Sequence, residues 1–179
     1  MKKMLLLLLL ASCSHQSFQL PTTKYDRKEW KHWVDEDRDC QNTRQEILIN
    51  RSYTDVKLNK KGCTVISGRW KDYYYPQVHT DAKNVDVDHL VPLKHAHEHG
   101  GAGWSKEQKE AFANDPENLV ITFRSYNRKK GAKGIDEWLP VNHDYACKYI
   151  KDWQWVKSKY NLAIGPKEQN TISKSKCKD

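Results

Sequence analysis

Apolar residues recur along the chain at two spacings, and these spacings predict a mixture of strands and helices. A β-branched run ends at Asp88 and His89, and a second apolar run covers residues 119–123, so both segments are predicted to be strands. A polar helix is predicted to begin at Ser125 and to carry Asn127. The two strands and this helix should converge on one point, which would bring Asp88, His89 and Asn127 together.

The rest of the chain predicts a scaffold around that point. Helices are expected over residues 26–37, 43–50, 106–113 and 144–160, and a strand over residues 63–70. Residues 144–160 give the clearest pattern, because apolar side chains recur there at helical spacing. The sequence contains no internal repeat and no sign of a second domain. The prediction is therefore a single α+β domain over residues 25–165.

The first residues predict an export signal. Lys2 and Lys3 are followed by Met4 and six leucines, a leader that is too short to span a bilayer. The leader ends in Leu-Ala-Ser-Cys, which resembles the bacterial lipobox, where the cysteine is lipidated; ordinary signal cleavage nearby is the alternative. We therefore expect a signal peptide over residues 1–12 and Cys13 as the candidate lipidated residue. The protein would be an envelope lipoprotein, touching a membrane only through that anchor, or a periplasmic or extracellular protein.

Polar segments flank the predicted domain. Residues 14–24 are mostly polar and predict a tether. The Lys-rich segment 166–179 predicts a basic tail that is loose unless Cys177 fixes it.

The cysteine count indicates an oxidising compartment. Five cysteines are an awkward number for an exported protein, but setting Cys13 aside leaves an even set, which is typical of two disulfides. Three pairings are possible, and closeness along the chain favours Cys40 with Cys63 and Cys147 with Cys177. A thiol catalyst is the competing interpretation, and it is disfavoured because no cysteine lies inside the Asp-His motif.

The protein carries an excess of positive charge. Removing Lys2 and Lys3 from the 31 basic residues leaves 29 against 23 acidic ones, a formal charge of +6. Net charge alone does not choose between nucleic acid, anionic lipid and acidic polysaccharide as the partner. The placement of the charge favours nucleic acid, because five basic residues crowd around Asn127, although a solvated basic face is the alternative. These residues are Arg124, Arg128, Lys129, Lys130 and Lys133.

The residue types at the predicted convergence point suit phosphodiester hydrolysis. This reaction needs a base for water and a cation for the charge that grows on phosphate and leaving oxygen. His89 can be the base, because an imidazole titrates near neutral pH. Asp88 and the amide oxygen of Asn127 are hard ligands, which favour Mg2+ over zinc, with Mn2+ as a substitute. Consecutive strand residues point to opposite faces, so Asp88 and His89 can share a site only where the strand ends or bends, which Pro92 favours.

Three other groups of residues offer alternative sites. Asp86 shares a strand face with Asp88 and is a reserve metal ligand, although a solvated residue is the simpler interpretation. A helix would place His95 and His99 on one face at metal-ligand spacing. Because no cysteine or carboxylate with zinc-site spacing lies nearby, a structural zinc is not expected. The tyrosines at 73–75 can stack bases or pack in a loop.

Three motifs together resemble a known nuclease family. DHLVPL at residues 88–93, NLVITF at 118–123 and NRKKG at 127–131 are similar to the His-Asn-His (HNH) endonucleases with a ββα-metal site. The resemblance is greatest to their secreted bacterial branch, related to the C-terminal nuclease domain of modification-dependent restriction enzymes. It covers roughly residues 38–160 and implies an α+β domain with a ββα-metal core and flanking helices.

The same resemblance implies roles for individual residues. His89 would be the general base, Asp88 and Asn127 the metal ligands, and Asn118 the residue that ties the hairpin together and orients His89. Lys130 matches a basic position often found after the last motif residue. The chain departs from the family pattern in having Asn127 where many members have a metal-binding His. It also lacks the paired CxxC zinc knuckles of some relatives.

The sequence therefore predicts an exported, monomeric endonuclease that uses one divalent cation to hydrolyse DNA, with RNA as a further candidate substrate. The resemblance implies a 5′ phosphate product. Little base specificity is expected, because no base-reading module is found. Two alternatives stay open. One is a noncatalytic surface protein that binds nucleic acid or another polyanion on a nuclease-like fold, and the other is a zinc-dependent hydrolase of another ester with His95 and His99 as ligands.

Overall fold

The strands form two antiparallel sheets, and helices surround the smaller one. The computed structural model of the protein describes residues 23–175 and 177. Within these residues a three-stranded sheet has the order β1-β2-β3, and a two-stranded sheet pairs β4 with β5. The elements in chain order are η1 (Arg27–Glu29), α1 (Thr43–Asn50), β1 (Lys57–Leu58), β2 (Val65–Lys71), β3 (Val78–Asp81), β4 (Val85–His89), α2 (Leu93–Glu98), η2 (Gly101–Gly103), α3 (Lys106–Asn114), η3 (Pro116–Asn118), β5 (Leu119–Phe123), α4 (Arg124–Lys130), α5 (His143–Lys159) and α6 (Pro166–Lys174).

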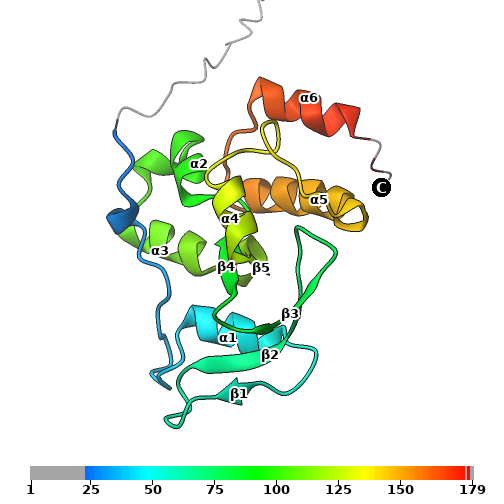
Figure 1. Ribbon diagram of the computed structural model, residues 1–179. Helices are drawn as coiled ribbons and strands as arrows, with labels where there is room; N and C mark the ends of the chain where they lie inside the picture. The colour runs from blue at the N-terminus through cyan, green and yellow to red at the C-terminus, as the bar shows by residue number, and fades with distance from the viewer. Residues whose placement is uncertain (1–22, 176, 178–179) are drawn as a thin grey trace, which may run out of the picture.

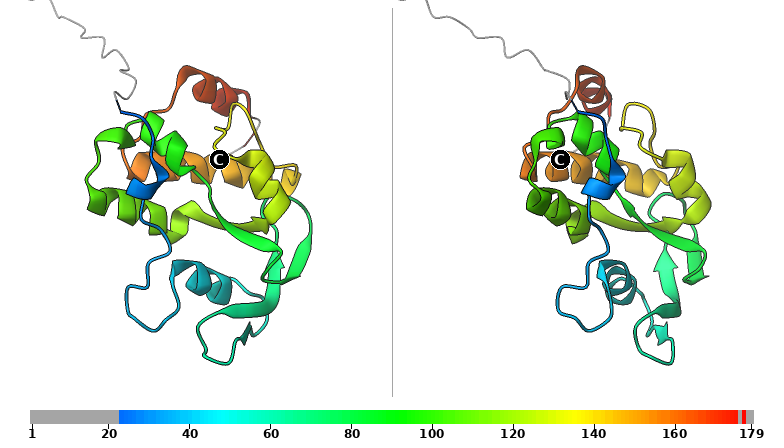
Figure 2. Two further views of the ribbon diagram at one scale, coloured as in Figure 1. Left: turned by 60° about the vertical axis from the view of Figure 1, so that its left-hand side comes forward. Right: turned by 90° about the vertical axis from the view of Figure 1, so that its left-hand side faces the viewer.

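The elements are arranged in three tiers. Helix α1 and the three-stranded sheet form one end of the molecule, α6 lies at the other, and β4, β5, α4 and α5 lie between them (Figure 1). The two turned views show the same order, with the N-terminal segment running beside α2 and α3 (Figure 2). Two hydrophobic clusters follow this division, one containing Trp70 near α1 and the other containing Trp153 on α5. The β4-β5 pair is buried between them.

The β4-β5 pair and α4 form the unit that positions the site. The pair is antiparallel, with Asp88 opposite Val120 and His89 opposite Leu119. Val87 packs in the cluster next to α1. The neighbouring Asp88 therefore points to the other face of the strand. Helix α4 begins directly after β5. The predicted strand, strand and helix are confirmed, as is the α+β class.

Most of the other predicted elements are confirmed to within two residues. The helices predicted over 43–50, 106–113 and 144–160 are α1, α3 and α5, and the strand predicted over 63–70 is β2. Strand β4 ends at His89, and Pro92 is the N-cap residue of α2. The strand thus ends directly after the Asp-His pair, which is the condition under which both side chains can share one site.

The helix predicted over residues 26–37 is wrong. Only Arg27–Glu29 forms a helical turn, of the 3-10 type. Trp30 is fully buried, with its ring centroid 5.7 Å from that of Phe112, and Trp33 has a φ of 60°. Packing of one indole into the core, followed by a residue in the left-handed region, overrides the weak helical pattern.

Residues 166–174 form a helix, where the sequence predicted a loose segment unless Cys177 fixes it. Pro166–Lys174 forms α6, whose residue Glu168 is buried and accepts hydrogen bonds from Trp153 and Lys157 of α5. Cys177 is disulfide-bonded, which is the condition under which the sequence allowed a fixed tail.

Two disulfides close loops at the two ends of the fold. They join Cys40 to Cys63 and Cys147 to Cys177, which confirms the favoured pairing. None of the helices in the described part of the chain is long and apolar enough to cross a bilayer. The predicted signal peptide, Cys13 and most of the predicted tether lie outside the described residues.

Candidate active site

A cleft of about 380 Å³ opens where β4 ends. Its walls include Asp88, His89, Asn127 and Arg128. The structure therefore brings together the residue predicted as the base, both predicted metal ligands and one of the predicted phosphate-binding residues.

One carboxylate oxygen of Asp88 is held from two sides. Its Oδ2 accepts a hydrogen bond from the hydroxyl of Tyr74 at 2.7 Å and from the ammonium of Lys130 at 2.8 Å. Its Oδ1 has no hydrogen-bond partner within residues 23–175. The carboxylate is thus fixed in place by one oxygen while the other is left available for a cation.

Lys130 lies behind the cleft and not in it. The side chain is fully buried, and its ammonium also donates to the backbone oxygen of His89 at 2.8 Å. Burial lowers the pKa of Lys130, and the charge of Asp88 opposes that shift. Lys130 therefore holds both members of the Asp-His pair, and it is not among the residues that line the cleft.

The imidazole of His89 is held in one tautomer. Its Nε2 lies 2.8 Å from the carbonyl oxygen of Ala113. A carbonyl only accepts, so Nε2 carries the proton and Nδ1 keeps its lone pair. The ring also stacks on Trp33, with 5.7 Å between centroids and 25° between planes. Burial lowers the pKa of His89 to about 4, so the ring is neutral at pH 7 and able to accept a proton.

Asn118 fixes the turn that follows the Asp-His pair. It is fully buried; its side chain accepts from the backbone N–H of Val91 at 2.8 Å and donates to the Val91 oxygen at 3.2 Å. Its own backbone oxygen accepts from the N–H of Leu90. These three bonds join the end of β4 to the start of β5.

Asn127 presents its amide oxygen from the first turns of α4. Its Nδ2 donates to Asp86 Oδ2 at 3.1 Å, while its Oδ1 has no hydrogen-bond partner in the described part of the chain. Asp86, the reserve metal ligand, is also 3.7 Å from the guanidinium of Arg124. Asp86 thus orients Asn127, and the guanidinium of Arg124 already compensates the charge of the Asp86 carboxylate. The oxygens left over, one from Asp88 and one from Asn127, are hard donors that suit Mg2+ or Mn2+.

The predicted basic face divides into residues in the cleft and residues outside it. Arg128 lines the cleft and makes no ion pair with a described residue. Lys129 lies over the ring of Tyr126 at 5.7 Å, and Lys133 donates to the backbone oxygen of Lys129. Both lysines are exposed. Among the exposed residues of this face, Arg128 is therefore the one that lines the cleft with Asp88 and His89.

Several residues of the site were missed by sequence reasoning. The hydroxyl of Tyr74 holds Asp88, the carbonyl of Ala113 sets the tautomer of His89, and Tyr25 and Arg27 line the cleft. Tyr74 belongs to the run of tyrosines at 73–75, for which the sequence allows base stacking or packing in a loop. Its full burial favours packing in a loop. No spacing in the sequence signals these contacts, because each depends on how distant segments pack.

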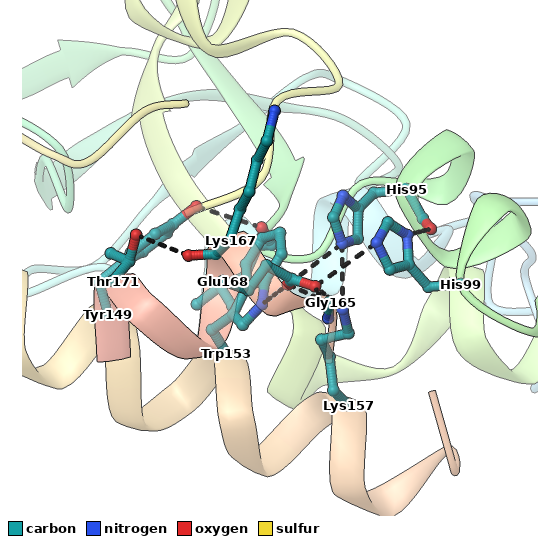
Figure 3. A network of polar contacts seen from close by, with 10 residues as sticks. His95, His99, Tyr149, Trp153, Lys157, Gly165, Lys167, Glu168 and Thr171 are labelled. Carbon is teal, nitrogen blue, oxygen red and sulfur yellow. Dashed lines mark hydrogen bonds and ion pairs between the residues drawn. The ribbon is translucent and has the colours of Figure 1, made fainter. Parts of the chain in front are cut away.

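A second polar cluster lies between α2, α5 and α6 (Figure 3). The rings of His95 and His99 stack with 3.7 Å between centroids. Glu168 lies 3.3 Å from Nε2 of His95 and 3.4 Å from Nε2 of His99. The carboxylate partner that the sequence did not show is therefore present, on the segment predicted to be loose.

This second cluster already contains a cation. The ammonium of Lys157 is fully buried and lies 2.8 Å from both oxygens of Glu168 and 3.1 Å from Nε2 of His95 (Figure 3). Trp153 also donates to Glu168. A zinc ion at the cluster would have to displace the ammonium, and a catalytic zinc needs an open coordination position. The contacts fit an internal ion pair that docks α6 onto α5.

Comparisons with known proteins agree with the geometry at β4. Residues 38–175 match the family described as GmrSD restriction endonucleases, C-terminal domain. The chain is 35% identical over 157 residues to an "Uncharacterized secreted protein" of Arthroderma benhamiae, an alignment that covers 87% of this chain and 76% of the relative. That relative is fungal, so the resemblance to a bacterial branch in particular is not confirmed. No solved structure matches.

Proposed function

Because this chain belongs to the family of GmrSD restriction endonuclease C-terminal domains, we propose that it is an exported, metal-dependent endonuclease that hydrolyses phosphodiester bonds of nucleic acids. One observation supports this most directly. Asp88 and His89 line the same cleft, and Nδ1 of His89 is the ring nitrogen left to accept a proton.

In this proposal His89 acts on the attacking water. The carbonyl of Ala113 and the ring of Trp33 hold the imidazole, so no reorientation is needed before proton transfer. Nδ1 takes a proton from water as the water oxygen bonds to phosphorus in line with the 3′ oxygen. The bond between phosphorus and the 3′ oxygen breaks, and this oxygen leaves and takes a proton from solvent. The product would carry a 5′ phosphate. Asn118 and Lys130 act as positioning residues, because they hold the turn and the Asp-His backbone.

Asp88 and Asn127 would hold the divalent cation, Mg2+ or Mn2+, through one oxygen each. The other polar atom of each side chain is occupied, by Lys130 and Tyr74 for Asp88 and by Asp86 for Asn127. When bound, the cation would neutralise charge on the phosphate and on the leaving oxygen.

We propose DNA as the main substrate and RNA as a further one, with little sequence specificity. Arg128 in the cleft and Arg124, Lys129 and Lys133 around it offer positive charge to phosphates. Phosphate contacts carry no base information. We expect the protein to act as a monomer.

Export is supported by two independent findings. The relative is called secreted, and two disulfides join the four cysteines of the described residues. The leader over residues 1–12 would direct export. We propose that the mature protein is either anchored through a lipid on Cys13 or released after signal cleavage.

The decisive experiment incubates the purified mature protein with plasmid DNA and with RNA, in the presence of Mg2+, Mn2+, Zn2+ or EDTA. We expect cleavage with Mg2+ or Mn2+, none with EDTA, and none from the His89→Ala variant. Binding without cleavage under all conditions would instead indicate a noncatalytic polyanion-binding protein. Zinc-dependent hydrolysis of other esters, lost in His95→Ala, would move the active site to the second cluster.

A further inference from the structure

The N-terminal strap, defined as residues 23–34, forms part of the cleft wall although it precedes the range that matches the family. Tyr25 and Arg27 line the same cleft as Asp88 and His89. The family match begins at residue 38. The strap therefore adds side chains to the candidate active site that the matched domain itself does not contain.

The strap is anchored on both sides of Arg27. Before it, the backbone oxygen of Thr23 lies 2.9 Å from Nε2 of His97. After it, Glu29 pairs with Lys109 at 2.6 Å, and Trp30 is fully buried in the core. These contacts hold the segment against α2 and α3 (Figure 2). Contacts on both sides of Arg27 thus hold its backbone in place in the cleft wall.

The guanidinium of Arg27 is not neutralised by the protein. It makes no ion pair with a described residue; its side-chain contacts are with Nε2 of His32, at 3.4 Å, and with the hydroxyl of Tyr25. Two other cations beside the cleft differ in this respect, because Arg124 pairs with Asp86 and Lys130 pairs with Asp88. Arg27 is exposed, so its donors are open to a ligand.

Arg27 lines the same cleft wall as His89, the candidate base. Arg128, on α4, is a second guanidinium that lines the cleft without an ion pair to a described residue. Two uncompensated guanidinium groups from distant parts of the chain thus face one small space that also holds the candidate base.

We propose that Arg27 binds a backbone phosphate of the nucleic-acid substrate in this cleft. The substrate would then be held from two sides, by Arg27 of the strap and by Arg128 of α4. This inference rests on the proposed function. Guanidinium groups suit this role, because their planar fork matches two oxygens of a phosphate and their charge is permanent. Tyr25 would form the wall beside the bound strand.

The test compares Arg27→Gln with the matched control Lys28→Gln. Lys28 is an exposed cation on the same helical turn that does not line the cleft. Affinity for a fluorescent DNA duplex is measured over a range of salt concentrations in EDTA, because EDTA removes the divalent cation and so prevents cleavage. The values of kcat and KM are then measured with Mg2+. Melting temperatures check that both variants fold.

We expect Arg27→Gln to weaken DNA binding about tenfold or more, as for other charge-assisted hydrogen bonds. The slope of log affinity against log salt should fall by roughly 0.9, the value for one lost phosphate contact. Lys28→Gln should change affinity by less than about twofold. Arg27→Lys should restore the salt slope but not the full affinity, because an ammonium cannot bind two oxygens in the same plane.

The two proposals fail in different ways. If wild-type protein binds and cleaves DNA while Arg27→Gln behaves like Lys28→Gln, the inference about the strap is overturned and the nuclease proposal stands. If wild-type protein neither binds nor cleaves nucleic acid, the proposed function fails, and the role of Arg27 fails with it.

Discussion

Asp88 and Lys130 form a buried ion pair, 2.8 Å apart, behind the cleft. Lys130 also donates to the backbone oxygen of His89, so one side chain fixes both members of the Asp-His pair. Loss of Asp88 would therefore remove a candidate metal ligand and also leave a buried cation unpaired.

Asp88→Ala and Asn127→Ala should both weaken divalent binding and cleavage, with partial rescue at high Mg2+ or Mn2+, because each removes one oxygen ligand. Only Asp88→Ala should also lower the free energy of unfolding, by about 3–5 kcal/mol, because Lys130 loses its partner. Calorimetric titration with Mn2+ and urea denaturation separate the two effects. In Asp88→Ala/Lys130→Met, stability should recover and metal binding should not. An equally large loss of Mn2+ binding in His95→Ala would contradict the assignment of the metal site.

His89→Ala should reduce the cleavage rate by about a hundredfold or more, the contribution expected of a general base. DNA affinity in EDTA should stay close to that of the wild-type protein, because the imidazole acts on water and not on the backbone of the substrate. Circular dichroism checks the fold, and His89→Asn serves as a second variant of smaller volume change. Near-normal turnover in both variants would remove His89 from the mechanism.

The parts of the site that could be predicted from the sequence are those set by local pattern. Alternation placed Asp88 at the end of a strand, and helical spacing placed His95 and His99 on one face. The residues that complete each cluster come from far along the chain. Glu168 meets His95 only because α6 docks on α5, and docking depends on tertiary packing that no local pattern records.

The failed prediction of a helix over residues 26–37 has the same cause. The free energy of burying Trp30 against Phe112 exceeds the small helix preference of a polar segment. The strap conformation that results is what brings Arg27 to the cleft. The sequence predicts the candidate base and the candidate metal ligands, whereas the wall that faces them depends on packing.

Neutralising Arg128, Lys129 and Lys133 together should weaken DNA binding about equally across sequences and flatten its salt dependence. Each lost phosphate contact should lower the slope of log affinity against log salt by roughly 0.9 on duplex DNA. Because Arg128 lines the cleft and the two lysines do not, Arg128→Gln alone should account for most of the loss in kcat/KM. An unchanged salt slope in the triple variant would mean that DNA enters over another surface.

Acidification should destabilise the fold through His95. Burial lowers the pKa of His95 to about 4, and the nearby charge of Lys157 also disfavours its protonation. The unfolded chain binds this proton near pH 6.5, so between pH 6.5 and 4 the unfolded state takes up more protons than the folded state. Stability from this group is thus complete above about pH 6.5 and is lost as the pH falls toward 4, by roughly 3 kcal/mol at most.

Melting temperatures measured from pH 7.5 to 4.5 test this sign. They should fall with pH in the wild-type protein and fall less steeply in His95→Asn, which cannot gain the proton. Identical pH slopes for the two proteins would show that His95 does not contribute.

Thiol labelling of the exported, unreduced protein should detect no free thiols among Cys40, Cys63, Cys147 and Cys177. Reduction should lower the melting temperature, because each disulfide typically contributes about 2–4 kcal/mol. Cys147→Ser/Cys177→Ser should release α6 in hydrogen exchange while leaving α1 protected, and Cys40→Ser/Cys63→Ser should do the reverse. Native alkylation of Cys40 or Cys63 would rule out the pairing.

Each disulfide joins cysteines that are neighbours in the described chain, so neither loop encloses the other. During export from the N-terminus, Cys40 and Cys63 emerge and can close before Cys147 is available as a wrong partner. Cys147 and Cys177 are then the remaining pair. Correct connectivity follows from the order of emergence, without the shuffling that nested bridges require. The β4-β5-α4 unit between the two loops can then fold without a covalent crosslink of its own.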